Sequence, residues 1–281
     1  MNAQDYACKA ESVFVLPDAV TKIKGLIDDD AASMQEIAEV IKYDPAIMSR
    51  VLKISNSALY GFPSKISTVT KAIQVIGVGA VYDLVLAYGT ANAFKGVDAK
   101  VIDLDRFWEQ SVSCALLARY FAEELSLKEP ERLFVCGLLH NIGELVVTQF
   151  SPEIAKKCQM TTTEYSPLQL QIKHLGFSYG EVGAKLLSLW GIPLAITGPI
   201  NRQHVSLSEA KTPDDKIIQL AYILALNNAS EEQHPAHNDI SAELYESLEI
   251  DLDCLERAMN FTNLQLMGAL ALFHPGIFTA L

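Results

Sequence analysis

His140 is the residue whose surroundings first suggest chemistry, because it interrupts a long apolar run from Val135 to Val147. Cys136 lies four residues earlier, so on a helix the two side chains share a face and could donate to one metal ion. No second pair of ligands is evident at a comparable spacing, and the five cysteines contain no C-x-x-C pair. A histidine in an apolar run is more often a hydrogen-bonded core residue. The run therefore favours a structural histidine over a metal ligand.

The elements that must position His140 are helices. Apolar residues recur at three- and four-residue steps and period-two alternation is rare, which predicts an all-α fold. A first helix is expected over Val13 to Ile27, and Ser33 and Asp44 are expected to cap the next two. Pro130 is expected to open one continuous apolar helix through Phe150, with His140 in its middle.

The order of these helices predicts two packed bundles. Residues 1–100 are expected to form an N-terminal bundle and residues 106–228 a second one. Residues 229–281 are expected to form a loop and a C-terminal helical extension. The polar block from Asn227 to Asp239 predicts a surface loop in which His234 and His237 are solvated.

Composition restricts the partners and the compartment. The chain is 50% hydrophobic over 281 residues, and its 34 acidic against 22 basic residues give a net charge of -12, which repels nucleic acid and anionic lipid. The N-terminus lacks the features of a signal peptide, and no uncharged apolar run is expected to reach membrane-spanning length, since Asp83 breaks the stretch that comes closest, Gly77 to Phe94. We therefore expect a cytoplasmic protein without a membrane or nucleic-acid partner.

Three groups of motifs, in this order and spacing, resemble the HDOD family, an output domain related to the HD phosphohydrolases. They cover roughly residues 14 to 205. The first group is LPDAV, YDPAIMSRVLKISNSALYG and TVTKAIQVIGVGAVYDLVL; the second is FWEQSVSCALLAR and VCGLLHNIGELVV; the third is HLGFSYGEVGAKLLSLWGIP. The resemblance implies a helical fold, with an HD-like second bundle, and a regulatory role in bacterial signal transduction.

The resemblance also implies where the metal ligands of an active HD enzyme would stand. Such a site needs a histidine, an adjacent His-Asp pair and a later aspartate, because the metal must activate a water and neutralise charge on phosphate. The matching positions here carry Gln110, the pair His140-Asn141, and Tyr222. An amide oxygen is a poor transition-metal ligand, and Asn141 lacks the charge of an aspartate.

Further positions agree with this interpretation. The additional histidines of relatives with two metals would fall near Tyr179 and at Gln203-His204, so only His204 remains. Glu144 stands where many active HD sequences carry a lysine that could meet phosphate, and its carboxylate would repel a phosphoester. The resemblance therefore implies a degenerate site formed by Gln110, His140, Asn141, Tyr179, His204 and Tyr222, with no metal or other cofactor.

The function expected from these observations is non-catalytic regulation through protein contacts. The family resemblance suggests a kinase, a response regulator or a cyclic-dinucleotide enzyme as the partner, and the oligomeric state stays open. The loop around Tyr60, Gly61 and Phe62 is a possible contact surface, because aromatic and glycine residues interrupt a polar connection there. Two alternatives stay open: a metal-dependent phosphohydrolase or phosphodiesterase with rearranged ligands, and a nucleotide-sensing pocket without hydrolysis.

Overall fold

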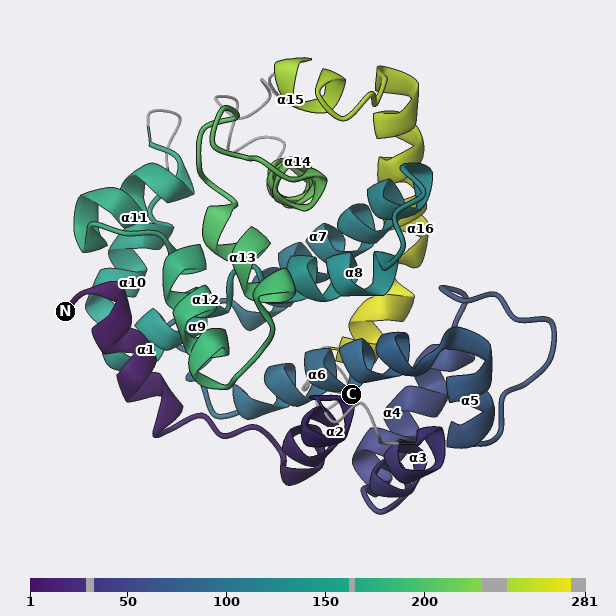
Figure 1. The fold of residues 1–281 in the computed structure, drawn as a ribbon. Coiled ribbons are helices and arrows are strands. Elements are labelled where there is room, and N and C mark those ends of the chain that lie inside the picture. The colour runs from purple at the N-terminus through teal and green to yellow at the C-terminus, as the bar shows by residue number, and fades with distance from the viewer. Residues whose placement is uncertain (29–32, 162–164, 229–241, 274–281) are drawn as a thin grey trace. The chain divides into compact units, whose positions relative to one another are not determined.

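The chain is built of helices that form two compact units. The computed structural model describes residues 1–28, 33–161, 165–228 and 242–273, and these contain helices and no strand, which confirms the predicted all-α class (Figure 1). Unit 1 comprises Met1–Phe14 and Gly96–Leu266, and unit 2 comprises Val15–Lys95 and Met267–Leu281.

Unit 1 is organised around two helices that each have several neighbours. The long helix α7 packs along α8 and α14, while α12 packs against α1, α9 and α13. Its helices are α1 (Ala3–Glu11), α7 (Leu104–Glu124), α8 (Pro130–Leu139), α9 (Ile142–Phe150), α10 (Pro152–Gln159), α11 (Pro167–Leu175), α12 (Tyr179–Leu189), α13 (Leu194–Arg202), α14 (Pro213–Asn228), α15 (Ala242–Glu246) and most of α16 (Leu252–Phe273).

Unit 2 is a smaller bundle in which α6 is the most buried helix. It contains α2 (Asp18–Asp28), α3 (Met34–Lys42), α4 (Pro45–Ser55), α5 (Val69–Ile76), α6 (Val78–Ala93) and the last turns of α16. Gly89 lets α6 approach α2, since an added Cβ would lie 2.4 Å from the Val20 side chain. Arg50 of α4 donates hydrogen bonds to the carbonyls of Ala271 and Leu272 in α16.

Local capping explains where several helices begin. Ser33 accepts a hydrogen bond from the Glu36 N–H in a capping box, and the Asp44 carboxylate accepts from two N–H groups just after Pro45. Both caps were predicted from the sequence and are confirmed. Ser166 and Ser178 form the same capping box at the starts of α11 and α12.

Two predicted helices differ in the structure. The helix expected over Val13 to Ile27 begins only at Asp18, because Pro17 disfavours helical geometry at the residue before it. The helix expected to run continuously from Pro130 to Phe150 is divided at His140 and Asn141 into α8 and α9.

The unit boundaries also differ from the predicted division at residue 100. Helix α1 was not predicted, and its residues were expected in the N-terminal bundle, but it packs on α9 and α12 of unit 1 because Tyr6, Ala7 and Ala10 are buried there. Asn227 and Asn228 end α14, and residues 229–239 of the predicted loop, including His234 and His237, lie outside the described residues.

One stretch of the described chain, Pro130–Phe150, is long and apolar enough to cross a membrane by length and composition alone. Most of its residues are buried inside the protein, as in the core helix of a helical bundle.

Candidate functional site

On either side of the break between α8 and α9, the backbones of α7 and α12 approach the chain very closely. A Cβ on Gly137 would lie 2.6 Å from the Cα of Ala115 in α7. A Cβ on Gly143 would lie 2.0 Å from the backbone oxygen of Tyr179 in α12. These glycines therefore allow α7 and α12 to approach the break closely enough to surround His140.

His140 is completely buried at this break. Its Nδ1 lies 2.6 Å from the carbonyl oxygen of Gly137, and because a carbonyl can only accept, Nδ1 carries the proton. Nε2 is then an acceptor, and it is buried without a hydrogen-bond partner among the described residues. The carbonyl of His140 accepts a hydrogen bond of 2.9 Å from the Gln203 amide. Burial lowers the pKa of His140 to about 4, so the ring is neutral at physiological pH.

Tyr222 of α14 contacts two histidine rings. Its ring centroid lies 5.6 Å from that of His140 and 4.8 Å from that of His204, in edge-to-face geometry at both. Burial lowers the pKa of His204 to about 3, and the nearby His140 adds to this effect. Burial also raises the pKa of the Tyr222 phenol. The cluster therefore consists of three neutral rings packed together.

Asn141 and Glu144 form a polar group beside this cluster. The Asn141 amide donates to one Glu144 oxygen, and the Gln159 amide donates to the other at 3.3 Å. Burial raises the pKa of Glu144, while these two hydrogen bonds and the charge of Arg106 oppose that rise. The first turn of α9 thus holds a carboxylate whose two oxygens are already engaged by amides.

A cavity of about 100 Å³ lies next to these residues and within unit 1. Gln110, Asn141, Tyr179 and Tyr222 line it together with Glu144, so the structure brings four predicted site residues to one cavity. Tyr179 is held by its backbone N–H, which donates to the Gln171 side chain at 2.8 Å. Since one water occupies roughly 30 Å³ of liquid and small-molecule pockets measure about 300 Å³ or more, this cavity has room for a few waters.

The side chains around the cavity do not fit a hydrolytic metal ion. Over residues 1–28, 33–161, 165–228 and 242–273, no group of three or more His, Cys, Asp and Glu residues is placed to bind a metal. The thiol of Cys136, the other ligand considered with His140, points to the carbonyls of Ala195 and Ile196 at 3.9 and 3.6 Å. A catalytic zinc site usually has about three protein ligands and an open position.

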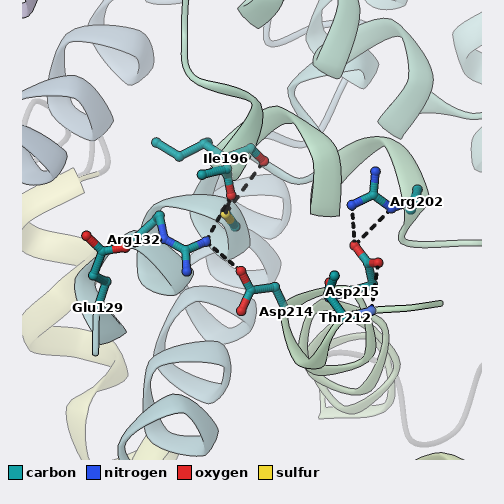
Figure 2. A network of polar contacts seen from close by, with 9 residues as sticks. Glu129, Arg132, Ile196, Arg202, Thr212, Asp214 and Asp215 are labelled. Atoms are coloured by element: carbon teal, nitrogen blue, oxygen red, sulfur yellow. Dashed lines mark hydrogen bonds and ion pairs between the residues drawn. The ribbon is translucent and has the colours of Figure 1, made fainter. Parts of the chain in front are cut away.

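Two ion pairs hold the ends of α8 and α13 to the first turn of α14, as Figure 2 shows. Arg132 of α8 contacts Asp214 at 2.6 Å and also donates to the Ala195 carbonyl. Arg202 of α13 contacts Asp215 through two nitrogens at 3.0 and 2.8 Å, and Asp215 is fully buried. These pairs fix α14, and with it Tyr222, against α8 and α13, which end just before His140 and His204.

Sequence reasoning missed this set of ion pairs. The signal was present in Asp214-Asp215 directly after Pro213, a typical helix start, but the arginines that pair with them are distant in sequence. The hydrogen bond from Asn141 to Glu144 was also missed, although residues three positions apart on a helix are neighbours.

The predicted contact surface belongs to unit 2. Tyr60 and Phe62 stack with ring centroids 5.9 Å apart and an interplanar angle of 16°. Gly61 between them has a φ of 56°, in the left-handed region that favours glycine. Both rings are half-buried and Gly61 is exposed.

Comparison with known proteins identifies a family. The model of the HDOD domain matches residues 13–206. A curated relative, an uncharacterized protein of Treponema pallidum (strain Nichols), is 25% identical over 209 residues, which are 72% of this chain and 39% of the relative. The chain thus spans about two fifths of the length of that relative.

Solved structures share the fold. A protein of Shewanella amazonensis SB2B, provisionally named a phosphohydrolase, has a TM-score of 0.72 at 22% identity, over 94% of this chain and 95% of that one. An HDOD domain protein with unknown function from Geobacter sulfurreducens has a TM-score of 0.71 at 19% identity, over 98% of each chain. A protein of Marinobacter aquaeolei VT8, provisionally named a signal transduction protein, has a TM-score of 0.71 at 18% identity, over 97% of this chain and 65% of that one. At these identities the likeness shows the fold alone.

Proposed function

We propose that this chain, which belongs to the HDOD domain family, is a non-catalytic, regulatory module of bacterial signal transduction that acts in the cytoplasm through contacts with another protein. The partner is a kinase, a response regulator or a cyclic-dinucleotide enzyme, as the resemblance of this chain's motifs to the HDOD family suggests. The HD-related site is degenerate in this proposal and serves to hold the helices of unit 1 together.

The observation that carries the proposal is which residues accompany His140. The His140 ring keeps Nε2 as an acceptor, but it contacts Tyr222, and the cavity beside it is lined by Gln110, Asn141 and Tyr222, the residues matched to the other HD ligands. Hydrolysis of a phosphodiester requires anionic and imidazole ligands in number, and two amides and a phenol packed between imidazoles do not supply them.

The nearby carboxylate supports the same conclusion. Both oxygens of Glu144 accept a hydrogen bond from a half-buried amide, so the place of this carboxylate in the site is explained without a metal. A negative charge at the cavity also disfavours a phosphoester substrate. The cavity of about 100 Å³ is too small for a nucleotide without movement of its walls.

The test combines metal analysis and activity on one sample of untagged protein. We expect far less than stoichiometric iron, manganese or zinc, and no hydrolysis of bis(p-nitrophenyl) phosphate above the rate of a His140→Ala variant. Near-stoichiometric metal with turnover that His140→Ala abolishes would overturn the proposal in favour of the phosphohydrolase.

A restored variant makes the test sharper. The triple substitution Gln110→His, Asn141→Asp and Tyr222→Asp places the missing ligand types at the matched positions. We expect it to bind more metal than the parent chain, because an imidazole and two carboxylates then accompany His140. Equal metal in the two proteins, both folded by circular dichroism, would show that these positions do not form the HD site.

A further inference from the structure

The net charge of the chain belongs entirely to one unit. Unit 1 has 14 basic and 26 acidic residues, for a net charge of -12, whereas unit 2 has 8 of each and is neutral. An acidic partner is therefore repelled by unit 1 and not by unit 2.

Within unit 2, the acidic residues are absent from the part of the chain that contains α4, α5 and their connection. Residues 45–82 include no Asp or Glu and carry Arg50, Lys53, Lys65 and Lys71. Arg50 is committed to the carbonyls of α16 and to the face of Tyr88. The three lysines are exposed and form no ion pair within the described part of the chain. They are thus available as cations.

The connection between α4 and α5, residues 56–68 (Figure 1), is closed by hydrogen bonds near its two ends. The Asn56 side chain accepts from the Ile66 N–H at 2.8 Å and donates to the Ile66 carbonyl at 2.7 Å. Thr68 caps α5 by accepting from the N–H of Lys71. These bonds bring the backbone near Lys53, which lies one turn before Asn56, close to the backbone near Lys65, which is next to Ile66. We call residues 56–68 with Lys53 and Lys71 the docking loop.

The docking loop also presents apolar surface. Tyr60 and Phe62 stack because the left-handed turn at Gly61 brings two side chains separated by one residue onto the same side. The Gly61 N–H donates to the Ser57 carbonyl at 3.3 Å, and the Ser57 hydroxyl donates to the Ile54 carbonyl at 2.7 Å. The aromatic pair is therefore formed before any partner arrives, which reduces the ordering cost of binding.

We propose that the docking loop binds an acidic segment of the partner protein, with carboxylates against Lys53, Lys65 and Lys71 and an apolar side chain against the Tyr60–Phe62 stack. The inference rests on the proposed function and specifies the chemistry of its partner. Complementary charge speeds encounter and fixes the orientation, while aromatic residues commonly supply the central contact of an interface. A nucleic acid is a poorer occupant, because its phosphates carry a higher charge density than an acidic peptide and are repelled more strongly by the net charge of unit 1.

A charge-matched pair of variants tests the docking loop. The loop variant is Lys53→Gln/Lys65→Gln/Lys71→Gln, and the control is Lys128→Gln/Lys157→Gln/Lys211→Gln, which removes three exposed lysines from unit 1. Both change the net charge by the same amount. The probe is a short fluorescein-labelled peptide of glutamates around a central phenylalanine, titrated by fluorescence anisotropy at about 50 and about 300 mM NaCl. We expect binding that weakens with salt, weakens about tenfold in the loop variant and changes about twofold or less in the control.

Several results would overturn this inference. These are the absence of peptide binding, equal losses in the loop variant and the control, tighter binding of a single-stranded oligonucleotide of equal charge, or a dimer that the loop variant dissociates. If the protein shows no metal, no turnover and no peptide binding, the docking-loop proposal fails and the proposed function stands. If it shows turnover, the proposed function fails whatever the peptide result is.

Discussion

The site around His140 and the docking loop use similar residue types in opposite ways. In unit 1, His140 and Tyr222 are buried and Glu144 is half-buried, and their rings and polar atoms contact residues of the same site. In unit 2, Tyr60 and Phe62 are half-buried and three lysines are exposed, in a loop held by a few local bonds. The comparison teaches that residue type alone does not mark a functional surface, because the same types of side chain are packed together in one unit and partly exposed in the other. The predictions below contrast the tightly packed unit with the exposed loop.

The largest expected effect is that of Gly143→Ala at the crossing of α9 and α12. The added methyl would lie 2.0 Å from the Tyr179 backbone oxygen and 2.9 Å from the Gly183 nitrogen, so two helix backbones must separate. We expect a loss of about 3 kcal/mol in the free energy of unfolding. Urea titration followed by tryptophan fluorescence measures it in unit 1, since Trp108 and Trp190 both lie there.

Gly79→Ala in α6 is the matched control. A Cβ there meets nothing within 4 Å, and alanine is the better helix former, so we expect unchanged or slightly increased stability by far-UV circular dichroism. A similar loss in both variants would contradict the claim that close backbone contact, rather than helix position, makes Gly143 necessary.

The second largest effect concerns the pH dependence of stability. The pKa of His140 is about 4 in the folded chain, below the value of about 6.5 for an unfolded one. The unfolded state therefore takes up a proton first as the pH falls. The stability contributed by the neutral ring is complete above pH about 6.5 and is lost as the pH falls toward 4, by about 3 kcal/mol in total.

His140→Asn isolates this contribution, because asparagine keeps a donor near the position of Nδ1 and does not titrate. The lowered pKa of His204 acts in the same direction as that of His140, and the raised pKa of Glu144 acts against both, but these groups remain in both proteins. We expect a shallower loss of stability between pH about 6.5 and 4 in the variant, measured by urea titration. Parallel curves would mean that His140 is already protonated or exposed in the folded chain.

A third comparison sets a buried ion pair of unit 1 against an exposed pair of unit 2. Asp215 is fully buried against Arg202, whereas the Lys42 and Glu39 side chains are 42% and 55% exposed. We expect Asp215→Ala to cost about 2 kcal/mol, because the Arg202 side chain is partly exposed and can turn toward water, and Glu39→Ala less than about 0.5 kcal/mol. Thermal unfolding by circular dichroism measures both. Equal losses would show that the network in Figure 2 contributes no more than a surface pair.

The sequence predicted the helical class and several helix starts because the signals are local. Ser33 and Asp44 carry their own capping chemistry, and the spacing of apolar residues needs no tertiary information. The placement of α1 was not predictable in this way, because its contacts with α9 and α12 join residues more than a hundred positions apart. The division of α8 from α9 was also missed, since the sequence is apolar on both sides of His140.

The site was predicted in part for a related reason. The family motifs named Gln110, Asn141, Tyr179 and Tyr222, which line one cavity, because motif order carries information about distant contacts. The tautomer of His140 and the pairing of Arg202 with Asp215 depend on which atoms face each other. No spacing rule encodes those facts.

Apart from the controls Gly79→Ala and Glu39→Ala, the smallest effect on stability is expected for Phe62→Ala in the docking loop. Phe62 is half-buried and its ring stacks on Tyr60 alone among the aromatic contacts described, so truncation removes little packing. We expect a change of less than about 1 kcal/mol in the free energy of unfolding and a clear weakening of partner or peptide capture. Calorimetric melting and anisotropy on the same sample separate the two. A large fall in melting temperature would show that Phe62 is a core residue. The docking loop would then not be an exposed recognition surface, and its contrast with the buried site would be wrong.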